Sequence, residues 1–439
     1  MASPTIHILG DDPNTTHRLN ACAYQQSAIT TFNGWQYAAF YTSVSRPHSA
    51  ARRVTLARRA IHTSSWQYLI FEDYEQTTDD GHNTISIGIC AGDATIHLSF
   101  DHHCDILKYR ISRPGLATDT DESSWIAGYF SPIQSHLPGQ GPNSLKDVTY
   151  PRFIPAGDDI YFECRIGNHQ TAKFTPLGAY LVGHKCNPYP NGVSYHPESN
   201  NLHVTWTNRH FIDYEGSHDQ TSTAHKAQAG PNGPENNEGL YHSYSPDDGV
   251  TWVSSNGGLV TSLSTDNATG LGSQDTRLRV KDIPRDSGIM NQEAQYVDVH
   301  GGVHVLNREN TSGQEKWVHY YREPRTGGWS IYEIPSVFPT ATGPRGKVVY
   351  CGRTNAVYLV LPSNTAHELI IARIKGDMQS SERDFEILWK EEGYVGEPLV
   401  DEEAFLQFGI LSIFILLEKL PTERKIAVLQ FNVDDLARL

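Results

Sequence analysis

SPDDGVTW, residues 245–252, is the stretch that most narrows the fold of this 439-residue chain. It fits the pattern S-x-D-x-G-x-T-W, in which each fixed position has a physical reason. The aspartate side chain can accept hydrogen bonds from backbone N–H groups, and the glycine supplies a dihedral that other residues rarely adopt. The tryptophan packs beneath the turn. The pattern therefore predicts a hairpin turn with a structural and not a catalytic role.

Strand-like runs recur on both sides of this turn, and Gly, Asp, Asn or Pro bounds each of them. Apolar residues either alternate or run continuously, which predicts half-buried or buried β-strands. The runs are WQYAAFYT (35–42), TIHLSF (95–100), IYFECRIG (160–167), NLHVTWTN (201–208), GVHVLNR (302–308), AVYLVLP (356–362) and ILSIFILL (410–417).

No helical stretch of a dozen residues stands out. The best candidate, AHELIIARIKG at 366–376, alternates well enough to be a strand. Seven units of about 60 residues would fill the chain, and the hairpin at 245–252 is typical of such repeats. We therefore predict an all-β protein, a single domain over residues 1–439 that folds as a seven-bladed β-propeller of antiparallel four-stranded sheets.

Composition supports this fold class and excludes several functions. The chain has 36 Gly, 22 Tyr and 8 Trp but only 19% charged residues, a balance that suits an all-β protein with many turns. Its net charge of −15 argues against a nucleic-acid partner. The short basic cluster at 52–59 (Arg52, Arg53, Arg58, Arg59) is expected to be a solvated edge or turn. Because the protein as a whole is negatively charged, a site for an anionic substrate must be locally positive.

Membrane and secretion signals are also absent from the sequence as written. The longest apolar stretch, FGILSIFILL (408–417), is about half of a spanning helix and predicts a buried strand instead. The N-terminus lacks the basic start and apolar core of a signal peptide. The scattered cysteines have no CxxC pair and resemble small buried residues, although one or two disulfides stay an alternative. They are Cys22, Cys90, Cys104, Cys164, Cys186 and Cys351.

Metal binding has weak support. The histidines at 97, 102 and 103 lack partners at zinc-site spacing, and TDTDESS (118–124) lacks EF-hand spacing. We expect that no cofactor or metal is required, with a structural Ca²⁺ ion as the alternative.

Residues 80–165 carry the side chains with the clearest chemistry. His82, His103, Tyr150 and Arg165 each lie in or beside a strand-like run. Removing a proton next to a carboxylate requires a base, an acid for the leaving group and a cation on the carboxylate. Histidine suits the base, tyrosine the acid and arginine the cation. These four residues are therefore candidates for such a reaction, with either histidine, or the tyrosine beside an arginine, as the base.

Several motifs resemble, in order, those of neuraminidase-type-repeat polysaccharide lyases. GHNTISIGICAGDATIHLSFDHHCDILKYRIS (81–112) is similar to their signature D-x-HN…G…IH-x-S-x-x-x-H…L-x-Y-x-x-S. VTYPRF (148–153), R-x-G (165–167), NLHVTWTNR (201–209), the 245–252 turn and MNQEAQYVDVHGGVHVLNREN (290–310) continue it over roughly residues 30–435. Within the family, the chain is similar to ulvan lyases and most similar to fungal L-rhamnose-α-1,4-D-glucuronate lyases.

The resemblance implies an extracellular carbon–oxygen lyase that acts on an acidic polysaccharide containing glucuronate. It would cleave the rhamnosyl-α-1,4-glucuronate linkage of gum arabic side chains by β-elimination, in an exo manner, with ulvan or another uronate polymer as the alternative substrate. We expect a monomer with no membrane partner. The motifs place the catalytic set on His82, His103, Tyr150 and Arg165, and the family pattern favours His103 over its neighbour His102.

Substrate contacts are expected from two further regions, the loop at 210–226 and the later motifs, because amides and arginines suit sugar hydroxyls and carboxylates. The candidates are Arg209, His210, Tyr214, His218, Asn291, Gln292, Asn307 and Arg308. Trp206 and Trp317 are expected in the blade core.

Two rival functions remain at this point. A sialidase-like glycoside hydrolase would share the 245–252 turn, but RFIP (152–155) does not match the Arg-Ile-Pro motif expected of such enzymes. A non-catalytic carbohydrate-binding propeller would bind uronate polymers without changing their ultraviolet absorbance.

Overall fold

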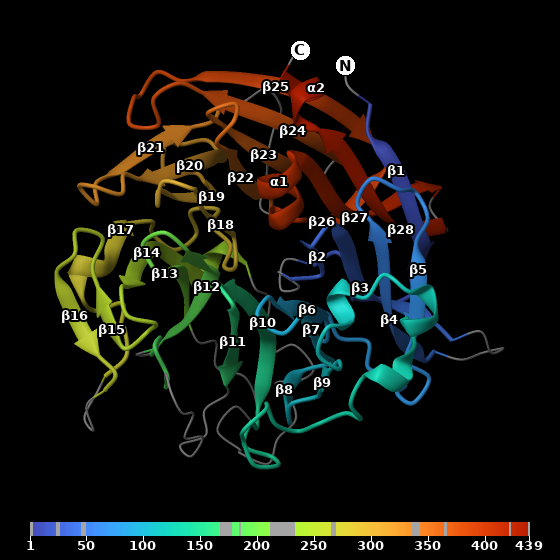
Figure 1. The fold of residues 1–439 in the computed structure, drawn as a ribbon. Helices are drawn as coiled ribbons and strands as arrows, with labels where there is room; N and C mark the ends of the chain where they lie inside the picture. The colour runs from blue at the N-terminus through green and yellow to red at the C-terminus, as the bar shows by residue number, and fades with distance from the viewer. Residues whose placement is uncertain are drawn as a thin grey trace. The chain divides into compact units, whose positions relative to one another are not determined.

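The computed structural model describes residues 3–22, 27–44, 50–166, 178–183, 186–210, 233–264, 269–335, 343–363, 367–420 and 423–437. The described residues form seven antiparallel β-sheets, and the protein is an all-β, seven-bladed β-propeller, as predicted (Figure 1). The chain divides into two compact units, Met1–Ala172 with Glu391–Leu439 and Lys173–Lys390. The single domain over 1–439 stays a prediction.

The first unit contains four of the sheets. One combines β1 (Thr5–Asp11), β28 (Glu423–Asn432), β27 (Ile410–Leu420) and β26 (Tyr394–Val400). The next contains β2 (Ile29–Phe32), β3 (Trp35–Ser43), β4 (Arg52–Ala60) and β5 (Gln67–Ile70). The remaining two are β6 (Ile85–Cys90), β7 (Thr95–Phe100) and β9 (Tyr109–Ile111), and β11 (Asp159–Ile166), β10 (Val148–Ala156) and β8 (His103–Asp105).

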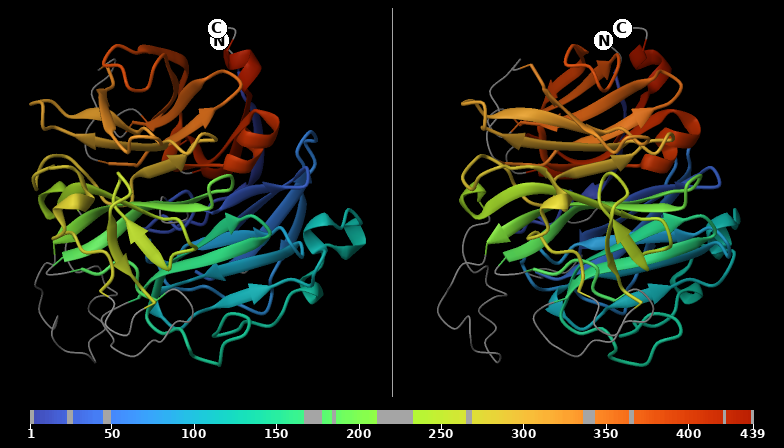
Figure 2. Two further views of the ribbon diagram at one scale, coloured as in Figure 1. Left: turned by 60° about the vertical axis from the view of Figure 1, so that its left-hand side comes forward. Right: turned by 90° about the vertical axis from the view of Figure 1, so that its left-hand side faces the viewer.

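Strands from the two ends of the chain share the first of these sheets. The N-terminal strand β1 pairs antiparallel with β28, with Thr5 opposite Gln430 and Asp11 opposite Lys425. Figures 1 and 2 show β1 alongside the C-terminal strands. Because β1 supplies an edge strand to a sheet that is otherwise C-terminal, hydrogen bonds between the two ends of the chain complete that sheet.

The second unit contains three sheets. The largest has β12 (Cys186–His196), β13 (Asn201–His210), β14 (Asn237–Ser245), β15 (Thr251–Val253) and β16 (Leu259–Ser262), with β17 (Arg279–Lys281) beside β14. The other two are β18 (Ala294–Val297), β19 (Val303–Glu309), β20 (Lys316–Arg322) and β21 (Trp329–Glu333), and β22 (Lys347–Cys351), β23 (Ala356–Pro362), β24 (Glu368–Lys375) and β25 (Asp384–Glu392). The ambiguous run at 366–376 is therefore mostly a strand.

Helices are short. Among the described residues, the α-helices are α1 (Glu402–Phe408) and α2 (Val433–Ala437), and the 3₁₀ turns are η1 (Leu116–Thr118), η2 (Glu122–Ser124), η3 (Ala127–Tyr129), η5 (Pro234–Asn236) and η6 (Thr276–Leu278). Asp401 begins α1 by accepting a hydrogen bond from the backbone N–H of Ala404. Within the described ranges, no helix has the length and apolar character needed to cross a membrane.

The turn at 245–252 has the predicted construction. Asp247 accepts hydrogen bonds from the backbone N–H and the hydroxyl of Thr251, at 2.7 and 2.8 Å. Gly249 has φ +85°, and Trp252 is buried with its indole N–H donating to the Gly249 carbonyl at 3.0 Å. The motif is therefore a structural turn, as its residue types indicated.

One expectation about the surface is wrong. The basic cluster is not a solvated turn, because Arg52, Arg58 and Arg59 lie in β4 and are buried. The Arg58 guanidinium lies over the rings of Trp35 and Trp125, at 4.9 and 4.3 Å. The apolar residues between these arginines are the signal for a buried strand, and the charges are satisfied by stacking and by hydrogen bonds.

Other expectations about the core are confirmed. Trp206 and Trp317 are buried, and the apolar run near the C-terminus is mostly β27. All six cysteines are free, but only Cys22 and Cys351 are buried as expected, whereas Cys90, Cys104, Cys164 and Cys186 are half-buried.

Candidate active site

The structure brings the four predicted catalytic residues together in the first unit. His82 lies in the loop before β6, His103 begins β8, Tyr150 lies in β10 and Arg165 in β11. The strand register explains part of this arrangement, because Thr149 of β10 pairs with both His103 and Arg165. One residue of β10 is therefore flanked on each side by a member of the predicted set.

Tyr150 has an unusual backbone at this point. Its φ is +56°, and the pairing of β10 with β11 shifts register between Thr149 and Arg152. A non-glycine residue in the left-handed region is uncommon, and such irregularities in a strand often re-aim a side chain beside a functional site. The ring of Tyr150 is stacked on His82, with centroids 5.6 Å apart and an interplanar angle of 26°.

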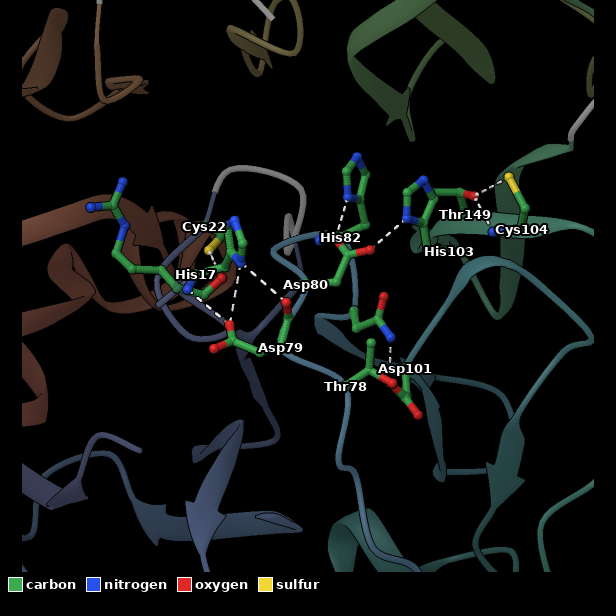
Figure 3. Close-up of polar contacts among 12 residues, drawn as sticks. His17, Cys22, Thr78, Asp79, Asp80, His82, Asp101, His103, Cys104 and Thr149 are labelled. Atoms are coloured by element: carbon green, nitrogen blue, oxygen red, sulfur yellow. Dashed lines mark hydrogen bonds and ion pairs between the residues drawn. The ribbon is translucent and has the colours of Figure 1, made fainter. Parts of the chain in front are cut away.

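Asp80 joins the two histidines. Its Oδ1 lies 2.5 Å from Nδ1 of His82, and its Oδ2 lies 2.6 Å from Nδ1 of His103. The two imidazole rings are stacked, with centroids 3.8 Å apart and an interplanar angle of 13°. Figure 3 shows the carboxylate at the edges of both rings, with one contact to each. Each carboxylate oxygen therefore holds one histidine.

The charges in this group are set by burial and by these hydrogen bonds. Burial alone would raise the pKa of the Asp80 carboxyl, but hydrogen bonds from His103 and His82 outweigh it and hold the pKa far below its usual range. The pKa of His103 is lowered, chiefly by burial and further by the charges of His82 and Arg165, although its bond to Asp80 opposes this. An ionised carboxylate flanked by a neutral imidazole is the expected state at neutral pH.

Arg165 supplies the cation of the site. Its guanidinium carbon lies 5.4 Å from the centroid of the Tyr150 ring, and one of its nitrogens lies 3.5 Å from Oγ1 of Thr149 and 3.8 Å from Sγ of Cys104. The Thr149 hydroxyl oxygen accepts the backbone N–H of Cys104 at 2.9 Å. This pairing, visible in Figure 3, connects the turn that carries His103 to the strand that carries Tyr150.

Asp80, His82 and His103 also form a potential metal-binding group, with ligand atoms within 4.8 Å of one another. Zinc binds an imidazole nitrogen at about 2.0–2.1 Å, along the lone pair in the ring plane. Because the two rings are nearly parallel and stacked, no point near both Nδ1 atoms lies in both planes. A shared ion would require at least one ring to turn, whereas two hydrogen bonds to one carboxylate fit the observed geometry.

Asp101 connects the loop that carries His82 to the segment that leads into His103. Its carboxylate accepts hydrogen bonds from Asn83 at 2.6 Å and from Gln76 at 3.0 Å, and also from the hydroxyl of Tyr74. Asn83 follows His82 directly, and Asp101 lies two residues before His103. The carboxylate therefore fixes both loops relative to each other.

His102 and His103 have different surroundings. His102 is fully buried, and its Nε2 accepts the backbone N–H of Lys108 at 2.7 Å. Burial, together with the charge of Lys108, holds its pKa well below the usual value. His102 thus has a structural contact, whereas its neighbour His103 lies beside His82 and Arg165.

The predicted substrate-binding residues lie in the second unit, apart from Tyr214 and His218, which fall outside the described residues. Arg209 and His210 end β13, and His210 is 2.9 Å from a carboxylate oxygen of Glu238. Asn291 and Arg308 are buried, and they donate to Asn237 and to the carbonyls at 343 and 344. Their contacts to substrate stay predictions.

Gln292 and Asn307 are also buried. Gln292 has φ +56°, and neither of its amide atoms has a hydrogen-bond partner among the described residues. Asn307 lies on the same face of β19 as Glu309, which accepts the Tyr320 hydroxyl. Their substrate contacts also stay predictions.

Reasoning from the sequence missed Asp80, Asp101 and Thr149. The signal for Asp80 was present, because it stands two residues before His82 and starts the D-x-HN pattern. Its contact with His103, 23 positions later, depends on how two loops meet, and no local pattern encodes that.

Comparisons with known proteins agree with this fold. A family model described as "BNR repeat-containing family member" matches residues 35–337. The polysaccharide lyase Uly1 is 16% identical, with a TM-score of 0.66 over 99% of this chain and 100% of Uly1. A PL25 ulvan lyase is 13% identical, with a TM-score of 0.65 over 98% of this chain and 99% of its own. At such identities the likeness shows the fold alone. No curated protein matches the chain.

Proposed function

We propose that this chain, which belongs to the BNR repeat-containing family whose model covers residues 35–337, is a polysaccharide lyase, because its first unit brings together two histidines, a tyrosine and an arginine. The observation that carries the proposal is the histidine pair held by Asp80 beside Tyr150 and Arg165. These residue types are what β-elimination from a uronate requires.

In the proposed reaction, Arg165 binds the carboxylate of the uronate and stabilises the charge that develops when C5 loses its proton. Nε2 of His103 or His82 takes that proton. The electron pair of the C5–H bond forms the C4–C5 double bond while the bond from C4 to the glycosidic oxygen breaks. The Tyr150 hydroxyl gives a proton to the departing oxygen, so the products are a free hydroxyl and an unsaturated uronate.

The substrate that we propose is the rhamnosyl-α-1,4-glucuronate linkage of gum arabic side chains, attacked from the end. Support comes from the motif resemblance described above. A PL25 ulvan lyase bound to -[GlcA(1-4)Rha3S]- has a TM-score of 0.59 and 12% identity over 98% of this chain and 99% of its own. That complex supports an acidic polysaccharide that contains glucuronate, and ulvan is therefore the alternative substrate.

The test is incubation of the purified protein with gum arabic and, separately, with ulvan. Elimination creates a conjugated uronate, so ultraviolet absorbance should rise with time. Free rhamnose from gum arabic alone would support the narrower substrate, and absorbance growth with ulvan alone would replace it. Saturated products would indicate a sialidase-like hydrolase, and binding without any product would indicate a carbohydrate-binding propeller.

We further propose that the enzyme is monomeric, acts outside the cell and needs no cofactor for this chemistry. A polymeric substrate favours an extracellular site of action, and the proposed steps use side chains only. Light scattering of the purified protein and activity after dialysis against a chelator test the first and last points. If the protein holds a structural Ca²⁺ ion, treatment with the chelator should lower the thermal stability without abolishing the activity.

A further inference from the structure

Asp80 is held rigidly before it meets either histidine ring. Its backbone carbonyl accepts the N–H of Asn83 at 3.0 Å, and its Oδ1 accepts the backbone N–H of His82 at 3.0 Å. The residue is 5% exposed. The carboxylate is therefore fixed in orientation by its own loop, independently of the two rings that it contacts.

Each ring uses the same nitrogen toward this carboxylate. An ionised carboxylate can only accept hydrogen bonds, so Nδ1 of His82 and Nδ1 of His103 must both carry a hydrogen. A neutral imidazole with a hydrogen on Nδ1 has its lone pair on Nε2. The contacts with Asp80 thus determine the tautomer of both rings.

The stacking has a second consequence. The two rings are nearly parallel, and their Nδ1 atoms bind the two oxygens of one carboxylate. Their Nε2 atoms therefore point in similar directions, on the side away from Asp80. The proposed elimination needs a base. Whichever histidine takes the proton, it would do so with Nε2 on this side.

We propose that Asp80 is a positioning residue for both histidines: it holds their rings in one stacked orientation with hydrogen on Nδ1, so that each presents a basic Nε2 to the substrate. This inference rests on the proposed function for its chemical purpose. The tautomers themselves exist without substrate and can be observed separately.

The first test is nitrogen-15 NMR of the imidazole side chains in the substrate-free protein, with His82→Gln and His103→Gln used to assign the two rings. The wild-type protein should show hydrogen on Nδ1 and the lone pair on Nε2 for both. In Asp80→Asn the side-chain amide can accept from one ring but must donate to the other. One histidine should then change tautomer. Hydrogen on Nε2 of both wild-type rings would overturn the proposal.

The second test is kinetic. Asp80→Asn should lower kcat by roughly 10²- to 10⁴-fold with KM changed less than about 3-fold, because the variant loses a correctly oriented base and not a substrate contact. Asp80→Glu retains an acceptor-only carboxylate and should recover part of kcat. Equal loss in both variants with a matching fall in thermal stability would mean that Asp80 only supports the fold.

Asp79 offers a matched control. It is the neighbouring carboxylate, and it accepts the backbone N–H groups of Thr16 and His17 at 2.8 Å each, outside the stacked pair. Asp79→Asn should leave kcat and both tautomers unchanged. If the protein shows no lyase activity on any polymer, the proposed function fails, and the NMR result still decides whether Asp80 sets the tautomers.

Discussion

Two groups in this molecule combine one buried aspartate with two stacked histidines, and their hydrogen-bond patterns differ. In the first unit, Asp80 binds His82 and His103 side by side, one on each carboxylate oxygen. In the second unit, Oδ2 of Asp298 binds one imidazole, at Nε2 of His304 (3.0 Å), while Oδ1 accepts the backbone N–H groups of His300 and Gly302. The second group continues as a chain, because Nδ1 of His304 lies 2.9 Å from Nε2 of His319.

The hydrogen-bonded series of side chains in the second unit ends at Arg383. This cation determines which ring nitrogens of the two histidines carry a hydrogen. Arg383 lies 3.0 Å from Nδ1 of His319, and arginine can only donate. His319 must then donate from Nε2 to His304, which in turn donates from Nε2 to Asp298. Both ring nitrogens of both histidines are used, and both side chains are fully buried.

The comparison teaches that two stacked histidine pairs can use their ring nitrogens in different ways. A linear chain uses every ring nitrogen for hydrogen bonds within the protein. In the branched arrangement, Nδ1 of each ring donates to the same carboxylate, which places the lone pair of a neutral ring on Nε2. His82 also retains partial exposure, with 19% of its side chain accessible, whereas His304 has none.

The largest expected effect is loss of catalysis in the branched group. His103→Gln should lower the rate of unsaturated uronate formation by roughly 10²- to 10⁴-fold, because a general base is removed. The unfolding midpoint should change little, since Gln can still donate to Asp80. Initial rates measured by ultraviolet absorbance check this. Full activity in this variant and in His82→Gln would break the comparison.

Removing a member of the linear chain should act on stability instead. His319→Leu removes the acceptor of Nη1 of Arg383 and the donor to Nδ1 of His304, which should cost about 3 kcal/mol of unfolding free energy. Urea unfolding followed by tryptophan fluorescence measures the change. The rate per folded molecule should stay at the wild-type level, and a 10²-fold fall would mean that this pair is also chemical.

Acid should lower the stability of the second unit through three buried histidines. Burial lowers the pKa of His203 to about 3 and holds those of His242 and His319 well below the usual value of 6.5. Each binds a proton more readily when unfolded, so their stabilisation is complete above about pH 6.5 and falls as the pH drops below it. The three together should lose about 2 kcal/mol between pH 7 and 6. A urea midpoint that does not change over this range contradicts the expectation.

The smallest effect concerns the neighbour of the proposed base. His102→Leu removes an acceptor from the backbone N–H of Lys108 but also removes a buried Nδ1 that has no hydrogen-bond partner among the described residues. These changes oppose each other, so the net cost should be about 1 kcal/mol. Thermal unfolding measures it. Lyase activity should persist, which would sharpen the assignment to His103.

Much of the fold could be predicted because its signals are local. The strand runs and the Asp247 turn depend on residues a few positions apart, and the period of two is visible in the sequence. The burial of Arg58 and Arg59 was not predicted, because it depends on Trp35 and Trp125 and on glutamine partners from other strands.

The residues of the candidate site could be predicted from the sequence, but the contacts that connect them could not. Ordered motifs pointed to His82, His103, Tyr150 and Arg165, and the structure places them together. The sharing of Asp80, the φ of Tyr150 and the brace formed by Asp101 arise from loops that meet in space. Their catalytic roles stay predictions until the variants are measured.

The pairing of β1 with β28 has a consequence for biosynthesis. Roughly 400 residues separate the two strands, so at about 5–20 residues per second β1 waits on the order of 20 to 80 s after its own synthesis for its partner. During that time His7 and Leu9, buried in the finished sheet, are exposed together with an unpaired strand edge. β1 is thus made long before the strand that pairs with it, and its edge stays open to other pairing until β28 has been synthesised.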